Sequence, residues 1–151
     1  MCNMIPDIQG SNEQDSWFYS DVVKDHFLQP RNFLLDEKSY KADGFGAVGS
    51  SACGDMMVVY IKIYKDEEGL EKIKECKWQT FGCASAIAST SMMSVMVTEN
   101  GGMTLKKAKR LKPQEITERL GGLPERKFHC SVLGHEALRM AVENYEIINK
   151  K

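Results

Sequence analysis

Hydrophobic residues at helical spacing mark a first helix near the N-terminus. The pattern predicts that this helix runs from Asp15 or Ser16 to about Leu28 and that Pro30 ends it. The residues before it, 1–15, are mostly polar and include a proline and a glycine. We expect this segment to form a disordered tail, because it has too little apolar surface to bury.

Three stretches with the composition of β-strands follow. Glycine-rich sequence leads into a predicted strand at 47–52, and a stronger strand signal covers 56–64. Residues 66–69, Asp-Glu-Glu-Gly, predict a turn, after which 73–81 has the composition of a partner strand. The sequence therefore predicts a small antiparallel meander.

The C-terminal half is predicted to be helical. Residues 85–99 are apolar around almost the whole helix, which is typical of a helix buried in a core. Shorter amphipathic helices are predicted at 104–109 and at 113–120, the second opened by a proline. The last predicted helix covers about 131–148. Its expected core stripe consists of Leu133, Ala137, Met140, Ala141 and Ile148.

This order of elements predicts an α+β fold with a small three-stranded antiparallel sheet. The chain has 151 residues, of which 42% are hydrophobic, and this is enough to build one core. We therefore expect a single domain at 16–151.

Composition and charge argue against several classes of function. A net charge of −1 and a pI near 6.3 give no footprint for nucleic acid or an anionic membrane. No apolar run reaches the roughly 18–20 residues that a membrane span needs. Acidic residues without Lys or Arg before Lys24 argue against a secretory signal or an Arg-rich transit peptide. The lack of such a targeting pattern and the odd number of cysteines together favour a reducing, cytoplasmic setting.

Three of the five cysteines carry the candidate chemistry. Cys53 lies in Ala-Cys-Gly-Asp, Cys83 in Phe-Gly-Cys-Ala-Ser and Cys130 in His-Cys-Ser. They are 30 and 47 positions apart, so only folding can bring them together. If it does, three thiolates with the imidazole of His129 and the carboxylate of Asp55 can hold a metal ion or an iron–sulfur cluster.

The positions of these cysteines add to the argument but do not decide it. Cys83 and Cys130 each precede a predicted helix, where the helix dipole and free N–H groups favour the thiolate. Taken one at a time, a structural role for each stays open, because no CxxC pair is present. Cys76, within a predicted strand, is expected to be a buried structural thiol.

The residues around the three cysteines resemble those of the iron–sulfur cluster assembly scaffolds of the IscU/NifU N-terminal family. The matching segments are 25–32, 52–55, 80–89 and 127–131, which occur in order within roughly 17–148. The resemblance implies the family fold, in which several helices cover one side of the sheet. It also implies the family function, which is to assemble and carry a cluster and is not enzymatic.

The resemblance implies a site made by the matching residues. Cys53, Cys83 and Cys130 would bind a transient [2Fe–2S] cluster, with either His129 or Asp55 as the fourth ligand. For Asp55 it implies a labile ligand, since a carboxylate is a poor partner for a soft iron–sulfide unit. A turn-capping role for this aspartate also stays open.

The implied mechanism is assembly followed by transfer. A cysteine desulfurase would pass persulfide sulfur to Cys130, iron would enter the site, and the cluster would move to apo-proteins. Lys127 would either hold the incoming persulfide or be a surface lysine. An electron donor, an iron-donor protein and a homodimer formed on cluster binding are further expectations. Residues 123–127, Leu-Pro-Glu-Arg-Lys, depart from the Leu-Pro-Pro-Val-Lys motif that a dedicated Hsp70 chaperone reads, so this partner stays in doubt.

A second function for the same residues stays open. Zn²⁺ accepts a mixed set of nitrogen, oxygen and sulfur ligands, so the site can instead hold zinc while one thiolate accepts sulfur. A dithiol oxidoreductase is disfavoured because neighbouring cysteines are missing. Among the other ionisable residues, His26 is expected to pack with the first helix. His135 is expected to be a solvated or helix-capping residue, and the basic cluster at 106–110 is expected to be a solvated face.

Overall fold

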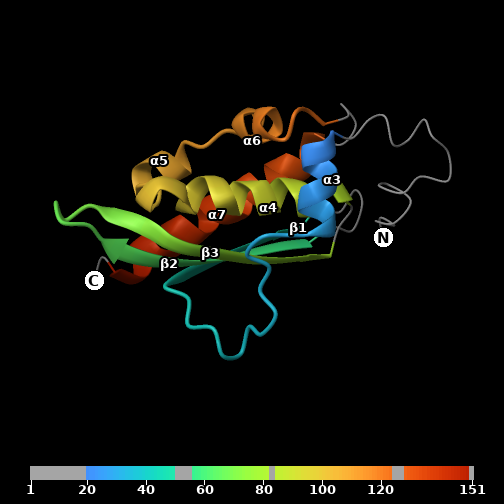
Figure 1. Ribbon diagram of the computed structural model, residues 1–151. Coiled ribbons are helices and arrows are strands. Elements are labelled where there is room, and N and C mark those ends of the chain that lie inside the picture. Colours follow the sequence, from blue (N-terminus) through green and yellow to red (C-terminus); the bar gives the residue numbers. More distant parts are fainter. Residues whose placement is uncertain (1–19, 50–55, 82–83, 124–127, 150–151) are drawn as a thin grey trace, which may run out of the picture.

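The computed structural model describes residues 20–49, 56–81, 84–123 and 128–149. Three strands form an antiparallel meander (Figure 1). They are β1 (Gly44–Gly49), β2 (Met56–Lys65) and β3 (Glu71–Phe81), with β2 in the centre. The described helices lie on one face of this sheet, and much of the connection between the first of them and β1 lies on the other side (Figure 1). The predicted α+β class and the one-sided helical layer are confirmed.

The helical layer is built from one long central helix and its neighbours. The described helices are α3 (Asp21–Leu28), α4 (Ala84–Thr98), α5 (Leu105–Lys109), α6 (Pro113–Arg119) and α7 (Phe128–Asn149), with a 3₁₀ turn, η1 (Glu99–Gly101), after α4. In the part of the chain that the structure describes, no helix has both the length and the apolar character needed to cross a membrane.

Helix α4 is buried around most of its circumference, as predicted. Its apolar side chains pack against β3, and α3 and α7 flank it. Its hydroxyl-bearing residues are buried too, and several donate hydrogen bonds to backbone carbonyls one turn back. Thr90 donates to Ala86 over 2.8 Å and Ser94 to Ser91 over 2.7 Å. A helix can therefore bury these hydroxyls without leaving them unpaired.

Strand β1 begins three residues earlier than the predicted strand at 47–52. Glycines in this segment predict a turn, yet Gly44 and Gly46 lie within the strand, where α7 approaches closely. A Cβ atom at Gly46 would lie 2.4 Å from the carbonyl oxygen of Ala137 and 2.6 Å from the backbone nitrogen of Ala141. Glycine is needed here because there is no room for a side chain.

The ends of two helices also differ from the prediction. Helix α3 begins at Asp21, because the Ser20 hydroxyl caps it by accepting the N–H of Val23 over 3.1 Å. The predicted start at Asp15 or Ser16 is therefore wrong, and the tail at 1–15 lies outside the described residues. Helix α7 begins at Phe128 instead of 131.

The predicted core stripe of α7 is right for three of its five residues. Leu133, Ala137 and Ala141 are buried. Met140 and Ile148 are wrong, with 44% and 54% of their surfaces exposed. The last turn of α7 projects beyond the sheet, since Gly44 at the start of β1 already packs against Tyr145. Met140 lies at the edge of the contact with β1. The buried face of α7 contains Leu138 and Val142 in their place.

The turn and the strand cysteine follow the sequence prediction. The Asp66 carboxylate accepts the N–H groups of Glu68 and Leu70, each over 2.9 Å, and Gly69 has a φ of +85°. Cys76 is buried in β3, and burial raises the pKa of its thiol to about 12. It is therefore a structural, unreactive thiol.

Replacing Gly46 by alanine is expected to destabilise the protein by about 2–3 kcal/mol, because the new methyl group would force α7 away from β1. The measurement is the free energy of unfolding from urea titration. Ala47→Ser, on the exposed side of the same strand, is the control and should change stability by less than about 0.5 kcal/mol. Equal stabilities of both variants would contradict the close-packing argument.

Candidate functional site

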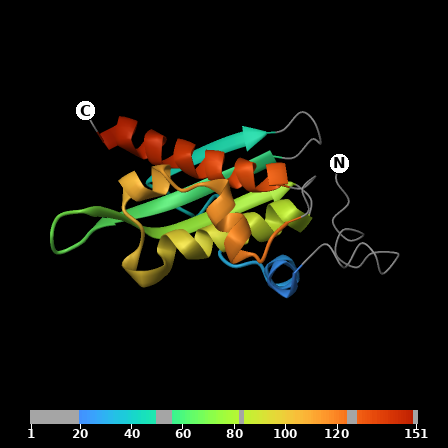
Figure 2. The same cartoon turned by 90° about the horizontal axis from the view of Figure 1, so that it is seen from above.

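The elements that flank the candidate ligands end or begin at the same end of the molecule. Gly49 at the end of β1 is paired with Met56 at the start of β2, and Phe81 at the end of β3 is paired with the same Met56. Helix α4 begins at Ala84, directly after the second of the three cysteines. Figure 2 shows the ends of β1 and β3 and the starts of α4 and α7 at one end of the domain.

The direction of α7 brings its start to this end. Gly44 packs against Tyr145 and Gly46 against Ala137, so α7 runs antiparallel to β1. Its N-terminal turns therefore lie toward the end of β1. Farther along α7, Gly134 lies next to Thr90 of α4, which brings the two helices together near the same end.

Most of the predicted site residues lie outside the described part of the chain. These residues are Cys53, Asp55, Cys83 and Lys127. The backbone of His129 and Cys130 lies in the first turn of α7, so the prediction that Cys130 precedes the helix is wrong by a few residues. The first turn still leaves N–H groups free to favour an anion. Among the described residues, no group of three or more His, Cys, Asp and Glu can hold a metal ion. The ligand set therefore stays a prediction.

Side-chain hydrogen bonds tie the strand ends next to these segments. The Thr80 hydroxyl donates to the backbone carbonyl of Met56 over 2.7 Å and so links the end of β3 to the start of β2. Met57, the register partner of Thr80, is fully buried, and its sulfur lies 3.3 Å from the Thr90 hydroxyl of α4. Neither contact can be predicted from the residue pattern, because each depends on the strand register.

The matching segment at 25–32 is part of the frame. The Ser91 hydroxyl of α4 accepts the N–H of Arg31 over 2.9 Å and lies 2.7 Å from Nδ1 of His26. Asn32 has a φ of +66°, and its amide donates to Ser94 over 3.0 Å. The indole N–H of Trp78 donates to the Arg31 carbonyl over 2.8 Å. The expected packing role of His26 is confirmed.

His26 is buried and His135 is half-buried, and burial affects the protonation of both. Burial, reinforced by the Arg31 guanidinium, lowers the pKa of His26 below its ordinary value of 6.5. Burial also lowers the pKa of His135, with the Arg139 guanidinium contributing. The expectation that His135 is solvated or caps the helix is wrong, since it lies well inside α7 and its Nδ1 is buried without a hydrogen-bond partner among the described residues.

The basic cluster at 106–110 is mostly exposed, as expected. Lys106, Lys107 and Arg110 face solvent on or next to α5. Lys109 is an exception, because its ammonium group forms a 2.7 Å ion pair with Glu146 of α7.

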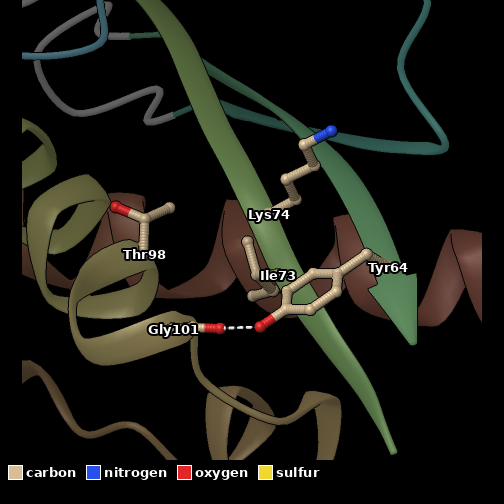
Figure 3. Close-up of a pocket in the computed structure, with 5 residues that line it drawn as sticks. All are labelled: Tyr64, Ile73, Lys74, Thr98 and Gly101. Atoms are coloured by element: carbon tan, nitrogen blue, oxygen red, sulfur yellow. Dashed lines mark hydrogen bonds between the residues drawn. The ribbon is translucent and has the colours of Figure 1, made fainter. Parts of the chain in front are cut away.

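Of two surface pockets, one lies away from the candidate site and the other reaches the strand ends beside it. A pocket of about 340 Å³ lies at the opposite end of the sheet, where the Tyr64 hydroxyl donates to the Gly101 carbonyl (Figure 3). The Lys74 side chain extends away from this hydrogen bond (Figure 3). Another pocket, of about 380 Å³, includes Met56 and Thr80 and so reaches the strand ends near the candidate ligands.

The sequence of this chain matches a known protein family. The sequence profile of the NifU-like N terminal domain matches residues 18–151, which is most of the chain. The chain belongs to this family.

Relatives of this NifU-like chain match most of its length. It is 46% identical over 127 residues to the iron-sulfur cluster assembly scaffold protein IscU 1 of Archaeoglobus fulgidus, covering 84% of this chain and 76% of that protein. It is 42% identical over 132 residues to the nitrogen fixation protein NifU of Nostoc, covering 85% of this chain but only 42% of that longer protein. The crystal structure of a NifU-like N-terminal protein from Brucella abortus has the same fold, with a TM-score of 0.58 at 18% identity over 96% of this chain and 99% of that one.

Lowering the pH should destabilise this NifU-like domain through His26. The unfolded chain takes up a proton near pH 6.5, whereas the folded histidine does so only at lower pH. The stabilisation is therefore present above pH 6.5 and lost as pH falls through the lower, folded pKa. Urea unfolding between about pH 7.5 and about pH 5 should show a smaller loss of stability for His26→Gln than for wild type.

The other buried histidine provides the matched comparison. His135→Gln should also reduce the pH dependence of the free energy of unfolding, by the amount that His135 contributes. The double variant should show the smallest change of this free energy with pH. Differences between variants remove the contribution of the carboxylates, which titrate in all of them. If the free energy of unfolding of His26→Gln depends on pH as strongly as that of wild type, burial does not lower the pKa of this histidine in the folded protein.

Proposed function

We propose that this protein is a scaffold on which a [2Fe–2S] cluster is assembled and from which it is transferred to apo-proteins. The observation that carries the proposal is the 46% identity to the archaeal scaffold protein over 84% of this chain. The arrangement of the frame supports it. The segments that hold Cys53 and Cys83, and the first turn of α7 with Cys130, adjoin element ends that gather at one end of the molecule.

The donor set suits an iron–sulfur cargo. Such a cluster is held by cysteine thiolates, and Cys53, Cys83 and Cys130 supply three of the four ligands it needs. Either His129 or Asp55 completes the set. A hard carboxylate bonds weakly to a soft iron–sulfide unit, so Asp55 as fourth ligand would favour release of the cargo.

Sulfur enters through the cysteine at the start of α7. A cysteine desulfurase presents a persulfide, and the Cys130 thiolate attacks its terminal sulfur. A new S–S bond forms on the scaffold as the bond within the desulfurase persulfide breaks and leaves its cysteine as a thiolate. An electron donor then supplies two electrons, which cleave the scaffold persulfide and release sulfide to iron. Lys127 assists by holding the anionic persulfide.

The partners follow from this chemistry. The scaffold needs the desulfurase, the electron donor, a source of iron and the apo-proteins that receive the cluster. It carries the cluster and does not turn over an organic substrate. Free thiolates require a reducing compartment, which in this proposal is the cytoplasm. Two chains sharing one cluster is a further feature of the proposal.

Reconstitution of the metal-free protein tests the proposal. Under anaerobic conditions, iron, cysteine and a desulfurase should produce a [2Fe–2S] absorption spectrum, and the cluster should transfer to an apo-ferredoxin. Cys53→Ala, Cys83→Ala and Cys130→Ala should each abolish stable cluster formation. Cys76→Ala is the matched control, because Cys76 is buried in β3, and it should still form the cluster. Persulfide on a protein that retains zinc, without a chromophore, would favour a zinc-bound sulfur acceptor and overturn the scaffold proposal.

Asp55→Ala should slow the loss of the cluster. The change removes the weak carboxylate donor and leaves the three thiolates with His129 as the fourth donor, so we expect the half-life of the bound cluster to lengthen by about tenfold, a change of about 1.4 kcal/mol in the barrier to release. The decay of visible absorbance with a chelator present gives the half-life. Glu67→Ala, in the exposed turn region at the other end of the sheet, should leave it unchanged. An unaltered half-life in Asp55→Ala would remove this aspartate from the labile role.

A further inference from the structure

A side-chain hydrogen bond joins the two strand ends that lead to candidate ligands. The Thr80 hydroxyl donates to the backbone carbonyl of Met56 over 2.7 Å. Met56 follows Asp55 directly, and Thr80 lies three residues before Cys83. The bond therefore connects the strand that leaves one proposed ligand to the strand that leads to another.

This bond is additional to the backbone pairing of the strands. Met56 is paired with Phe81, and Thr80 is paired with the next residue of β2, Met57. The hydrogen bond thus runs diagonally across the last two register positions. Strand ends open more readily than strand centres, because the final pair has a neighbour on one side only. A hydroxyl bonded to the first residue of β2 opposes that opening.

Backbone pairing with Gly49 and Phe81 also holds Met56, but its side chain adds little to this. Met56 is 44% exposed, so packing contributes little to holding the first residue of β2. The next residue, Met57, is fully buried and touches Thr90 of α4 on the opposite face. The core therefore fixes β2 from Met57 onward, while the residue that adjoins Asp55 is held by its strand partners and by the Thr80 hydroxyl.

We propose that Thr80 is a positioning residue for the cluster site. Its hydroxyl holds the Asp55 end of β2 against the Cys83 end of β3, so that the ligands on both segments reach one metal centre together. Thr80 itself does not contact iron or sulfide in this proposal. The inference rests on the proposed function, because it assigns Asp55 and Cys83 to one site.

Cobalt binding tests the proposal without requiring a working cluster. Co²⁺ bound by thiolates absorbs strongly, so an anaerobic titration of the reduced full-length chain gives its affinity. Thr80→Val keeps the branched shape and removes the donor, and we expect it to bind Co²⁺ about three- to tenfold more weakly. Thr80→Ser keeps the hydroxyl and should bind Co²⁺ nearly as well as wild type.

A control variant separates positioning from general stability. Thr98→Val removes a comparable hydroxyl bond, to the Ser94 carbonyl over 2.6 Å, at the far end of α4. It should leave the Co²⁺ affinity unchanged even if it lowers the melting temperature. For Thr80→Val we expect the affinity to fall while the melting temperature stays within a few degrees of wild type.

The outcomes distinguish this inference from the proposed function. Equal affinities of Thr80→Val and wild type, or equal losses in Thr80→Val and Thr80→Ser, would overturn the positioning role alone. So would an affinity loss in Thr98→Val as large as that in Thr80→Val. A wild-type protein without a thiolate–cobalt absorption band would overturn the proposed function, and this inference with it.

Discussion

The fold depends on enclosing α4, a helix with little surface suited to water. Ala86, Ala88, Met93 and Val97 are fully buried, and the hydroxyls between them bond to the backbone of the helix itself. Such a helix is stable only when other elements surround it. The sheet covers it on one side through β3, and α3 and α7 cover its flanks. Because these contacts fix α4, they also fix the point at which the chain enters it, immediately after Cys83.

The second constraint is the close contact between α7 and β1. Two glycines, Gly44 and Gly46, allow the helix backbone to lie directly on the strand. The N–H of Phe45 is then bonded to the Asn144 side chain over 3.1 Å, so α7 also provides a partner for the edge of the sheet. This contact sets the direction of α7 and brings its first turn, with Cys130, to the end of the molecule where β1 ends.

The sequence was sufficient for properties that depend on local pattern. The long buried helix, the turn at 66–69 and the structural role of Cys76 all follow from spacing and residue type. The β1 glycines were misleading, because a glycine in a turn and a glycine under a helix look alike in sequence. The exposure of Met140 and the burial of the His135 ring nitrogen depend on where neighbouring elements end, which periodicity does not contain. The ligand set came from motif resemblance, since no local pattern joins positions 30 and 47 residues apart.

The two ends of the sheet are held differently, and the difference suits a carrier. At the end away from the candidate ligands, Asp66 accepts two backbone N–H groups and pairs with Lys72 over 3.0 Å, and the N–H of Ile73 donates to the Met103 carbonyl. At the ligand end, the first residue of β2 is half-exposed and is bonded to the side chain of Thr80. A site for a permanent metal gains from ligands fixed within packed elements, since rigidity favours retention. A cargo that must leave is better held by ligands that adjoin a firm frame than by ligands within it, because ligand exchange then leaves the packed core unchanged.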